Sequence, residues 1–330
     1  MLELAMDATI TDPRVSPANT GDAREAIDIR ITADQAEWDS LIASCPDPHL
    51  PQGFAYGEGK AAKGWTVRRA VFSDGGRPVA FATVLELRRL GLRLVTRVNR
   101  GPLFLDAEPP HGIVVGVHRA LRRRWRGPLL IAPALPAGGS SDRQLREAGF
   151  RVRHRHSWRS GRIDLDRDEA EIWAGLASTF RNRYRKAEAA GVTLRISGDD
   201  ETFEWMLARH AENMAEKGFN AADATLLRSM RAARPEDVRV YQLLLDDRPV
   251  AGMSVVQFGR LVEYHIGWFG PEGRAVNAGN FLMWHVMKES RRRGATRFDV
   301  GGLKPGDGYT QFKGTMKPVE YELAGEWMSI

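Results

Sequence analysis

Residues 238–269, VRVYQLLLDDRPVAGMSVVQFGRLVEYHIGWF, decide the fold class of this chain. The stretch divides into three runs rich in β-branched and aromatic residues, at 238–245, 250–258 and 261–269, which predicts three consecutive strands. Two-residue turn signals, Asp246-Asp247 and Gly259-Arg260, separate the runs. Such short connections join antiparallel neighbours, so the stretch predicts an antiparallel meander.

Helical periodicity flanks this meander on both sides. The predicted helices cover 169–176, 180–190, 200–217 and 278–294, and the predicted strands cover 192–196, 297–300 and a final run near 319–327. The stretch 299–317 between the last two strands is rich in glycine and is expected to be a loop that presents lysines. The second half is therefore a mixed α/β unit.

The first half repeats this plan of helix, meander, helix and strand. Its predicted strands are a run that follows Gly64 directly, the runs 27–31, 79–87, 92–98 and 129–132, and an extended stretch at 152–165. Its predicted helices cover 33–43, a short segment ending near Gly64, 111–125 and 142–148. The duplication predicts an α+β fold with two tandem domains, 27–165 and 166–330. Residues 1–26 are polar and irregular and are expected to be a disordered tail.

Composition limits the classes of protein that fit. The chain has 330 residues, of which 43% are hydrophobic and 27% charged, as in ordinary globular proteins, and no apolar run is long enough to cross a bilayer. The N-terminus lacks a basic region before an apolar one, so a cytoplasmic protein is expected. A net charge of +6 indicates attraction to polyanions such as tRNA, anionic headgroups or nucleotide phosphates.

Several chemistries have no sequence signal. The single cysteine, Cys45, excludes an internal disulfide and any cysteine-rich metal site. The phosphate-binding P-loop, the Rossmann glycine motif, the serine nucleophile elbow and the zinc-binding HExxH motif are all missing from the sequence. Neither a metal nor a cofactor is expected. Arginine outnumbers lysine 40 to 8, so each lysine is a stronger candidate for function than each arginine.

Four segments, taken together and in order, carry a more specific signal. They are QGFAYGEGKAAKGW at 52–65, NRGPLFLD at 99–106, STFRNRYRKAEAAGV at 178–192, and a C-terminal block that includes NAGNFLMWHVMKESRRRGATRFDVGG at 277–302 and YTQFKGTMKPVEYELAGEW at 309–327. The chain resembles the Fem family of peptidyltransferases, also called FemAB, from about residue 28 to residue 330. The resemblance implies two GNAT-like domains and aminoacyl transfer.

Lys313 is the first catalytic candidate. Peptide-bond formation from an activated ester requires an amine nucleophile, a proton acceptor and a cation where the oxyanion develops. Lys313 stands beside glycine-rich turn sequence, and the family resemblance implies a stabilising lysine at this position. Asp106 is the candidate proton acceptor, although an aspartate after a Pro turn is also an ordinary turn residue.

Substrate-binding candidates follow from the same resemblance. Lys63 and Trp65 would hold the phosphate and sugar of the acceptor, although a helix-terminal charge and a core tryptophan explain them equally well. Tyr264 matches a substrate-lining tyrosine, against the simpler explanation of strand packing. The remaining candidates, from the turn after the second segment and from the C-terminal block, are Arg100, Tyr309 and Phe312.

The third segment is basic nearly all round and suits a polyanion backbone. Arg181, Arg183, Arg185 and Lys186 are its cations, and the family resemblance implies an aminoacyl-tRNA as donor. A second arginine cluster, at 122–126, could contact tRNA or membrane headgroups, or neither.

The identity of the acyl donor distinguishes the alternative functions. A GNAT enzyme that uses coenzyme A holds the pyrophosphate on a glycine-rich loop before a helix. Residues 274–280, RAVNAGN, lack the first glycine of that loop, which favours aminoacyl-tRNA over an acyl-CoA or acyl-carrier donor acting on a polysaccharide or small-molecule amine. A basic RNA-binding module on an inactive GNAT scaffold is the non-enzymatic alternative.

The acceptor is the most open part of the prediction. No heptad-bearing hairpin lies between residues 201 and 238, where cell-wall enzymes of the family often carry a coiled coil, and Lys217 stands near the expected acceptor contact. The expected acceptor is a lipid-linked or nucleotide-linked peptidoglycan precursor that accepts a small amino acid. Peripheral contact with the inner face of the plasma membrane is a further expectation, and DNA is not expected as a partner.

Overall fold

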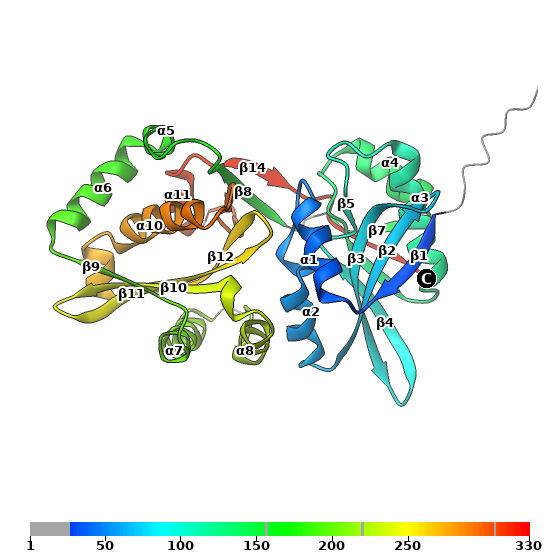
Figure 1. Cartoon of the computed structure of the whole chain (residues 1–330), viewed down its shortest axis with the longest axis horizontal. Coiled ribbons are helices and arrows are strands. Elements are labelled where there is room, and N and C mark those ends of the chain that lie inside the picture. The colour runs from blue at the N-terminus through cyan, green and yellow to red at the C-terminus, as the bar shows by residue number, and fades with distance from the viewer. Residues whose placement is uncertain (1–26, 156–157, 219–220, 307) are drawn as a thin grey trace, which may run out of the picture.

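Two β-sheets flanked by helices form the molecule (Figure 1). The structure is a computed structural model and describes residues 27–155, 158–218, 221–306 and 308–330. The tail predicted at residues 1–26 lies outside this range. Both sheets are mostly antiparallel, so the prediction of an α+β fold with two tandem GNAT-like domains is confirmed.

The first sheet has the strand order β1-β2-β3-β4-β6-β15-β7, with β5 paired to β3. Its strands are β1 (Asp28–Thr32), β2 (Trp65–Asp74), β3 (Arg77–Arg89), β4 (Leu92–Asn99), β5 (Leu103–Phe104), β6 (Leu129–Ala132), β7 (Arg151–His154) and β15 (Glu326–Ser329). The helices of this half are α1 (Gln35–Ser44), α2 (Phe54–Ala61), α3 (His111–Arg124) and α4 (Gly139–Glu147), with a 3-10 turn at Leu50–Gln52.

The second sheet has the order β14-β8-β13-β12-β11-β10-β9. Its strands are β8 (Arg159–Asp164), β9 (Thr193–Ser197), β10 (Val238–Leu245), β11 (Arg248–Phe258), β12 (Leu261–Phe269), β13 (Arg297–Asp299) and β14 (Val319–Glu322). The helices are α5 (Glu169–Gly175), α6 (Ser178–Ala189), α7 (Asp200–Lys217), α8 (Ala224–Ala233), α9 (Pro271–Ala275), α10 (Ala278–Arg292) and α11 (Gly308–Gly314), with a 3-10 turn at Pro235–Asp237. Helices α7 and α8 lie on one side of this sheet, and α6, α10 and α11 lie on the other (Figure 1).

The two sheets exchange one strand each. β8 follows β7 directly in the chain but pairs with β13 and β14 in the second sheet. β15 follows β14 but lies between β6 and β7 in the first sheet. The single extended stretch expected at 152–165 and the single final strand expected near 319–327 are therefore each two strands in different sheets. The boundary between domains 27–165 and 166–330 stays a prediction. β8 comes before this boundary but belongs to the second sheet, and β15 comes after it but belongs to the first.

Three helices differ from the sequence prediction: α8, α11 and the short α9, which was not predicted. The glycine-rich stretch before the last strands was expected to be a loop, but its residues Gly308–Gly314 form α11. Helix α8 was not predicted, although Asp223 caps it by accepting from the Leu226 backbone N–H, and its buried leucines pack against the first domain. Tertiary packing stabilises such short amphipathic helices more than propensity does.

A shared apolar core joins the two halves. Trp38 and Phe81 of the first half pack in one cluster with Leu226 and Phe258 of the second. Helix α2 approaches α8 closely at Gly59, where a Cβ atom would lie 2.6 Å from the Leu226 side chain. This contact fixes the end of α2 beside the start of α8. Among the described residues, no helix is both long and apolar enough to span a membrane.

Candidate active site

The second sheet opens where two of its strands diverge. β12 and β13 run parallel and pair only from Leu261 to Glu263 on β12 and from Arg297 to Asp299 on β13. Beyond these pairs β12 continues to Phe269 while β13 has ended. Tyr264 and His265 therefore lie where the neighbouring strand is missing, and α11 approaches them there.

Two adjoining cavities meet at this opening. The interdomain cavity, about 440 Å³, is lined by Leu50, Tyr56, Lys60, Lys63, Arg100, Trp158, Ala221, Ala222, Asp223, Leu226, Glu263, Tyr264, His265, Gly301, Gly302 and Lys313. The α7 cavity, about 350 Å³, is lined by His210, Asn213, Lys217, Ala221, Tyr264, His265, Ile266, Gly267, Phe269, Gly302, Lys304, Tyr309 and Lys313. Both cavities share Tyr264, His265 and Lys313 on their walls, so one group placed at this junction can contact ligands in both.

Lys313 is held rigidly at the junction. Its residue is only 4% exposed, and its Nζ donates to the Gly302 carbonyl at 2.9 Å. The same Nζ lies 5.1 Å from the centre of the Tyr264 ring and 5.5 Å from that of Tyr309. The two tyrosine hydroxyls are 2.9 Å apart, which joins the rings into one wall. The negative faces of the two rings attract the ammonium and help to hold it at this place.

A glycine pair makes the carbonyl contact to Lys313 possible. Gly301 has φ +73°, a conformation that favours glycine, and a Cβ there would lie 2.8 Å from the Tyr264 carbonyl oxygen. The Gly301 N–H donates to Asp299 at 2.9 Å. Asp299 is itself buried and also accepts from Ser160 and Tyr321. The guanidinium of Arg162 and these hydrogen bonds hold the Asp299 carboxyl pKa below its usual range, against the opposing effect of burial.

A buried ion pair crosses between the domains on the wall of the interdomain cavity. Arg100, just after β4, contacts Glu263 of β12 with nitrogen–oxygen distances of 3.2 to 3.4 Å. Its guanidinium also lies 4.0 Å from the Trp158 ring centre. Burial raises the pKa of Glu263, and Arg100 opposes that shift. The pair fixes the first domain against the strand that carries Tyr264 and His265.

His265 is a site residue that the sequence analysis missed. Burial lowers its pKa to about 4, so the imidazole is neutral at neutral pH. Burial also lowers the pKa of His210 on α7, whose Nε2 lies 3.1 Å from the Ala222 carbonyl. A neutral imidazole can accept a proton, and His265 lines both cavities. Nothing in its local sequence distinguishes it from an ordinary strand residue.

The lysines of the chain concentrate at this site. Five of the eight line one cavity or both: Lys60, Lys63, Lys217, Lys304 and Lys313. Of the 40 arginines, by contrast, only Arg100 is among the lining residues of these two cavities. The α7 cavity has no carboxylate among its described lining residues. This arrangement suits ligands that carry phosphate or other anionic groups.

The structure brings most of the predicted substrate residues together. Lys63, Arg100, Tyr264 and Lys313 line the interdomain cavity, and Tyr309 lines the α7 cavity. Lys63 pairs with Asp223, the cap of α8, which fixes its position at the cavity wall. Phe312 lies behind this wall, where its ring packs against Tyr309 with centroids 6.1 Å apart.

Asp106 and Trp65 lie outside both cavities. Asp106 accepts a hydrogen bond from the Glu108 backbone N–H at 3.0 Å, which makes it a turn residue. The proton-acceptor role expected of it stays a prediction. Trp65 begins β2 and pairs with Leu87 of β3, so its half-buried ring lies on the sheet beyond Lys63.

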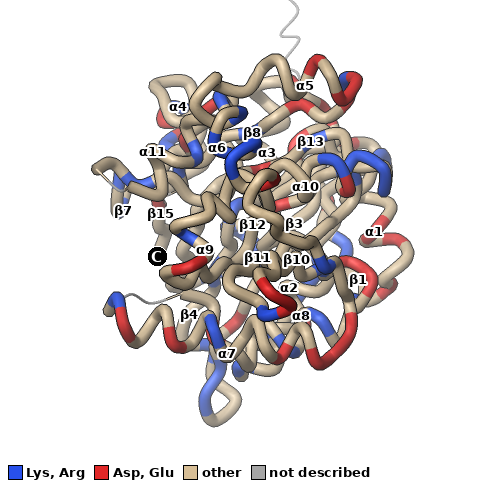
Figure 2. The backbone as a smooth tube through the Cα atoms, turned by 90° about the vertical axis from the view of Figure 1, so that its left-hand side faces the viewer, with Lys and Arg blue, Asp and Glu red and all other residues tan. Residues whose placement is uncertain are grey.

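The predicted cations of the basic helix α6 lie outside the two cavities. Figure 2 shows α6 in the upper half of the molecule and α7 in the lower half, and none of the four predicted cations lines either cavity. Arg181 donates to the carbonyls of Trp173, Ala174 and Leu176 and so caps α5. Arg183, Arg185 and Lys186 are exposed, and their contact with tRNA stays a prediction.

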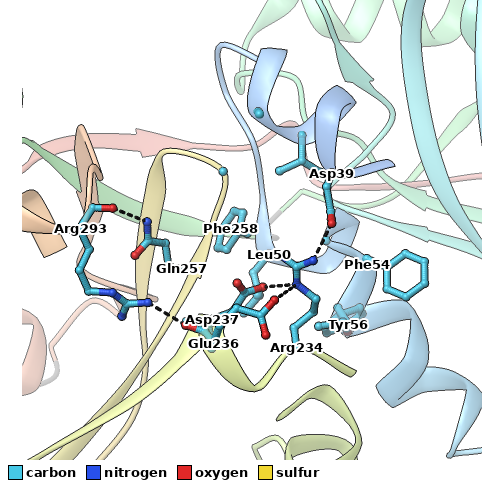
Figure 3. A pocket seen from close by; sticks show the side chains of 16 residues that line it. Asp39, Leu50, Phe54, Tyr56, Arg234, Glu236, Asp237, Gln257, Phe258 and Arg293 are labelled. Carbon is cyan, nitrogen blue, oxygen red and sulfur yellow. Dashed lines mark hydrogen bonds and ion pairs between the residues drawn. The ribbon is translucent and has the colours of Figure 1, made fainter. Parts of the chain in front are cut away.

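A third cavity between the domains is occupied by its own ion pairs (Figure 3). Arg234 contacts Asp39 of α1 at 2.7 Å, Glu236 at 2.9 Å and Asp237 at 3.2 Å. Burial raises the pKa of Asp237 to about 6, with Arg234 opposing the shift. Because its charges already satisfy each other, this cluster joins the domains and is a weaker ligand site than the lysine-lined cavities.

Comparison with known proteins agrees with this geometry. Residues 175–314 match the model of the acetyltransferase (GNAT) domain family. The crystal structure of FemX superposes with a TM-score of 0.77 at 16% identity, covering 92% of this chain and 97% of FemX. None of the curated proteins matches the sequence significantly.

Two further solved structures share the fold. One is L-PGS from Bacillus licheniformis, with a TM-score of 0.54 and 12% identity over 89% of this chain and 91% of that one. The other is the C-terminal domain of a predicted lysylphosphatidylglycerol synthetase from Agrobacterium fabrum, with a TM-score of 0.54 and 14% identity over 89% of this chain and 92% of that one.

These matches confirm the predicted resemblance at the level of the fold, and the family model confirms the prediction of an acyltransferase. Residues 175–314 are similar to the acetyltransferase (GNAT) domain family, and the chain as a whole has the two-domain fold of FemX.

Proposed function

We propose that the chain is an N-acyltransferase that moves a small amino acid, such as glycine, alanine or serine, from aminoacyl-tRNA to an amine of a peptidoglycan precursor. The observation that carries this proposal is the buried Lys313 at the junction of two lysine-lined cavities. A transferase that joins two large anionic substrates needs two approaches to one reacting centre, and this junction supplies them.

The chemistry needs a cation at the junction. The acceptor nitrogen attacks the ester carbonyl carbon of the donor, a C–N bond forms, and collapse of the tetrahedral intermediate breaks the C–O bond to the ribose. Negative charge develops on the former carbonyl oxygen in between. Lys313 is suited to stabilise it, because its ammonium is fixed by the Gly302 carbonyl and two rings before the reaction begins.

Proton transfer falls to His265 in this proposal. The attacking amine must lose a proton, and the ribose oxygen must gain one as it leaves. His265 lines both cavities, and its ring is neutral at neutral pH because burial lowers its pKa to about 4. Anionic groups of a bound donor would raise this pKa and make the ring a stronger proton acceptor. It takes the role that the sequence suggested for Asp106.

We assign one substrate to each cavity. Lys60, together with Lys63 and Arg100, which are paired with Asp223 and Glu263, lines the interdomain cavity and would contact the phosphates of the acceptor. Lys217 and Lys304 line the α7 cavity and would contact the phosphates near the 3′ end of the tRNA. The exposed cations of α6 would then meet the tRNA farther from the reacting end.

An acyl-CoA donor is the second candidate, because the matching family model describes acetyltransferases. Residues 271–275, which precede the α10 helix, form the short helix α9. Arg274 donates to the Phe269 carbonyl. These features disfavour a pyrophosphate site there and favour the tRNA donor.

The test compares donors in one assay. The purified chain is incubated with a lipid-linked precursor and either charged tRNAs or a set of acyl-CoA thioesters, and the mass of the acceptor is measured. We expect a mass gain of one amino acid residue that depends on charged tRNA. Turnover of an acyl-CoA without tRNA-dependent gain would contradict the tRNA proposal, and RNA binding without any transfer would support an inactive scaffold.

A further inference from the structure

The hairpin between β3 and β4 exposes three leucines at its tip. Leu90 is 94% exposed, Leu92 is 70% exposed and Leu94 is 48% exposed. The hairpin projects from the body of the molecule at the lower end of the view in Figure 1. Large apolar side chains grouped on a projecting element gain nothing from folding, so their contribution lies in contact with something outside the chain.

The backbone of the turn makes the leucine at its tip more unusual. Leu90 and Gly91 both have positive φ, +49° and +78°, the pattern of a type I′ turn. Such turns favour Asn or Gly at the first position, and a bulky residue there is strained. The three other two-residue hairpin loops between described strands are Gly75-Gly76, Asp246-Asp247 and Gly259-Arg260. Leucine replaces a better turn residue only in the β3–β4 hairpin.

Arginines surround these leucines. Arg88 and Arg89 precede the turn and Arg93 follows it. Arg93 donates to the backbone carbonyl of Arg126, which places the exposed arginines of the run 122–126 beside the hairpin. The sequence has no acidic residue from 87 to 105 or from 109 to 141. Glu86, the nearest carboxylate, is buried and already contacts Arg88 and Trp125.

We propose that this hairpin docks on an anionic lipid bilayer, with Leu90, Leu92 and Leu94 inserted among the headgroups and the arginines against the anionic lipids. Apolar side chains that insert into a bilayer are removed from water, and basic residues next to them are attracted to the negative headgroups. A protein partner would need an apolar groove with acidic walls that matches the hairpin in shape. An anionic bilayer supplies both the apolar contact and the negative charge without such a match.

The hairpin and the interdomain cavity share one end of the first sheet. Trp65 of β2 pairs with Leu87 of β3, three residues before the tip. Lys63, two residues before Trp65, lines the interdomain cavity. Docking would therefore hold this cavity near the headgroups, where a lipid-linked acceptor presents its phosphates. This consequence rests on the proposed function, but the docking itself does not.

The test measures vesicle binding of the full chain by co-sedimentation. Vesicles of phosphatidylcholine alone are compared with vesicles that also contain phosphatidylglycerol, for the wild type, Leu90→Asn/Leu92→Thr and Arg88→Gln/Arg89→Gln. Val319→Ser is the matched control, because Val319 is 78% exposed on β14 of the other sheet.

We expect the wild type and Val319→Ser to bind the phosphatidylglycerol vesicles, and each double variant to bind them about 30-fold more weakly. Leu90→Asn creates an Asn-Gly turn, so the leucine variant keeps or raises the melting temperature while it loses lipid binding. A structural role for the leucines would instead lower the melting temperature.

Three results would overturn the proposal. The double variants could bind vesicles as the wild type does, the wild type could bind neither kind of vesicle, or the leucine variant could convert a dimer to a monomer, which would make the hairpin a self-association surface. Transfer to a soluble nucleotide-linked acceptor is measured in parallel. If the wild type shows no transfer but binds vesicles through the hairpin, the proposed function fails and the docking stands.

Discussion

At the scale of single residues, the interdomain ion pair of Arg100 and Glu263 gives the sharpest test of how the site is held. Arg100→Ala leaves the Glu263 carboxylate buried without its cation, so the free energy of unfolding should fall by about 3–5 kcal/mol at neutral pH. Burial raises the pKa of Glu263, so the charge that costs stability is lost when the carboxyl takes up a proton. The loss should therefore shrink as the pH is lowered.

Urea denaturation at several pH values measures this effect. Arg100→Met/Glu263→Met is the matched control, because it removes both charges and fills similar volume. It should be closer to the wild type than Arg100→Ala is. If the single and double variants are equally destabilised at neutral pH, the pair does not hold the domains through its charge.

The sequence indicates a candidate residue most clearly where the residue's own segment carries a pattern. Lys313 and Tyr264 stand in segments that resemble those of the Fem family, and both line the two cavities, while their roles stay predictions. His265 was not a candidate because its place on the cavity walls depends on β13 ending early beside it, which no local pattern encodes. Asp106 became a candidate because of its carboxylate, and in the structure this carboxylate accepts a hydrogen bond from the Glu108 backbone N–H within its turn.

At the scale of elements, helix α3 contains a buried histidine that links stability to pH. His118 is 1% exposed, its Nδ1 lies 2.8 Å from the Val114 carbonyl, and Phe104 and Phe150 pack around it. Burial lowers its pKa to about 4. The unfolded chain binds a proton below about pH 6.5 while the folded chain does not, so acid favours unfolding.

His118 alone should remove about 3 kcal/mol from the free energy of unfolding between pH 6.5 and pH 4. Above pH 6.5 neither state is protonated and the contribution is flat. Chemical denaturation of the wild type and of His118→Met across this range checks the effect. The variant should lose this part of the pH dependence, and an unchanged slope would show that other groups produce it.

Helices and strands were predicted from the sequence most accurately where the local hydrophobic periodicity is strong. The three strands of 238–269 and the long helix α7 were predicted within a few residues of their observed bounds. Helix α11 was expected to be loop because glycines stand at both of its ends, and α8 was missed because its packing surface comes from α2 of the other domain. Both are helices that tertiary contacts stabilise.

At the scale of the whole molecule, the strand exchange makes the two sheets depend on each other. Trp327 of β15 is fully buried in the core of the first sheet, although it lies at the C-terminal end of the chain. Trp327→Ala should lower the free energy of unfolding by about 3–5 kcal/mol, because it leaves a large cavity between β6 and β7.

The measurement is thermal or chemical unfolding of Trp327→Ala with Trp65→Ala as the control, since Trp65 is half-exposed at the start of β2. The control should lose much less stability. A small loss in Trp327→Ala would mean that β15 is dispensable to the first sheet. The sequence could not predict this exchange, because a final strand carries no signal that assigns it to the more distant of two sheets.

The central proposal at this scale is that both substrates meet at Lys313, at the junction of the two cavities. The rate of aminoacyl transfer by Lys313→Met tests it most directly. Methionine keeps the volume of the side chain and removes its charge, and Lys317→Met, on an exposed residue four positions later, is the control. We predict that Lys313→Met lowers kcat by about 100- to 1000-fold with little change in acceptor binding, while Lys317→Met transfers at the wild-type rate. Equal transfer rates for Lys313→Met and the wild type would contradict the claim.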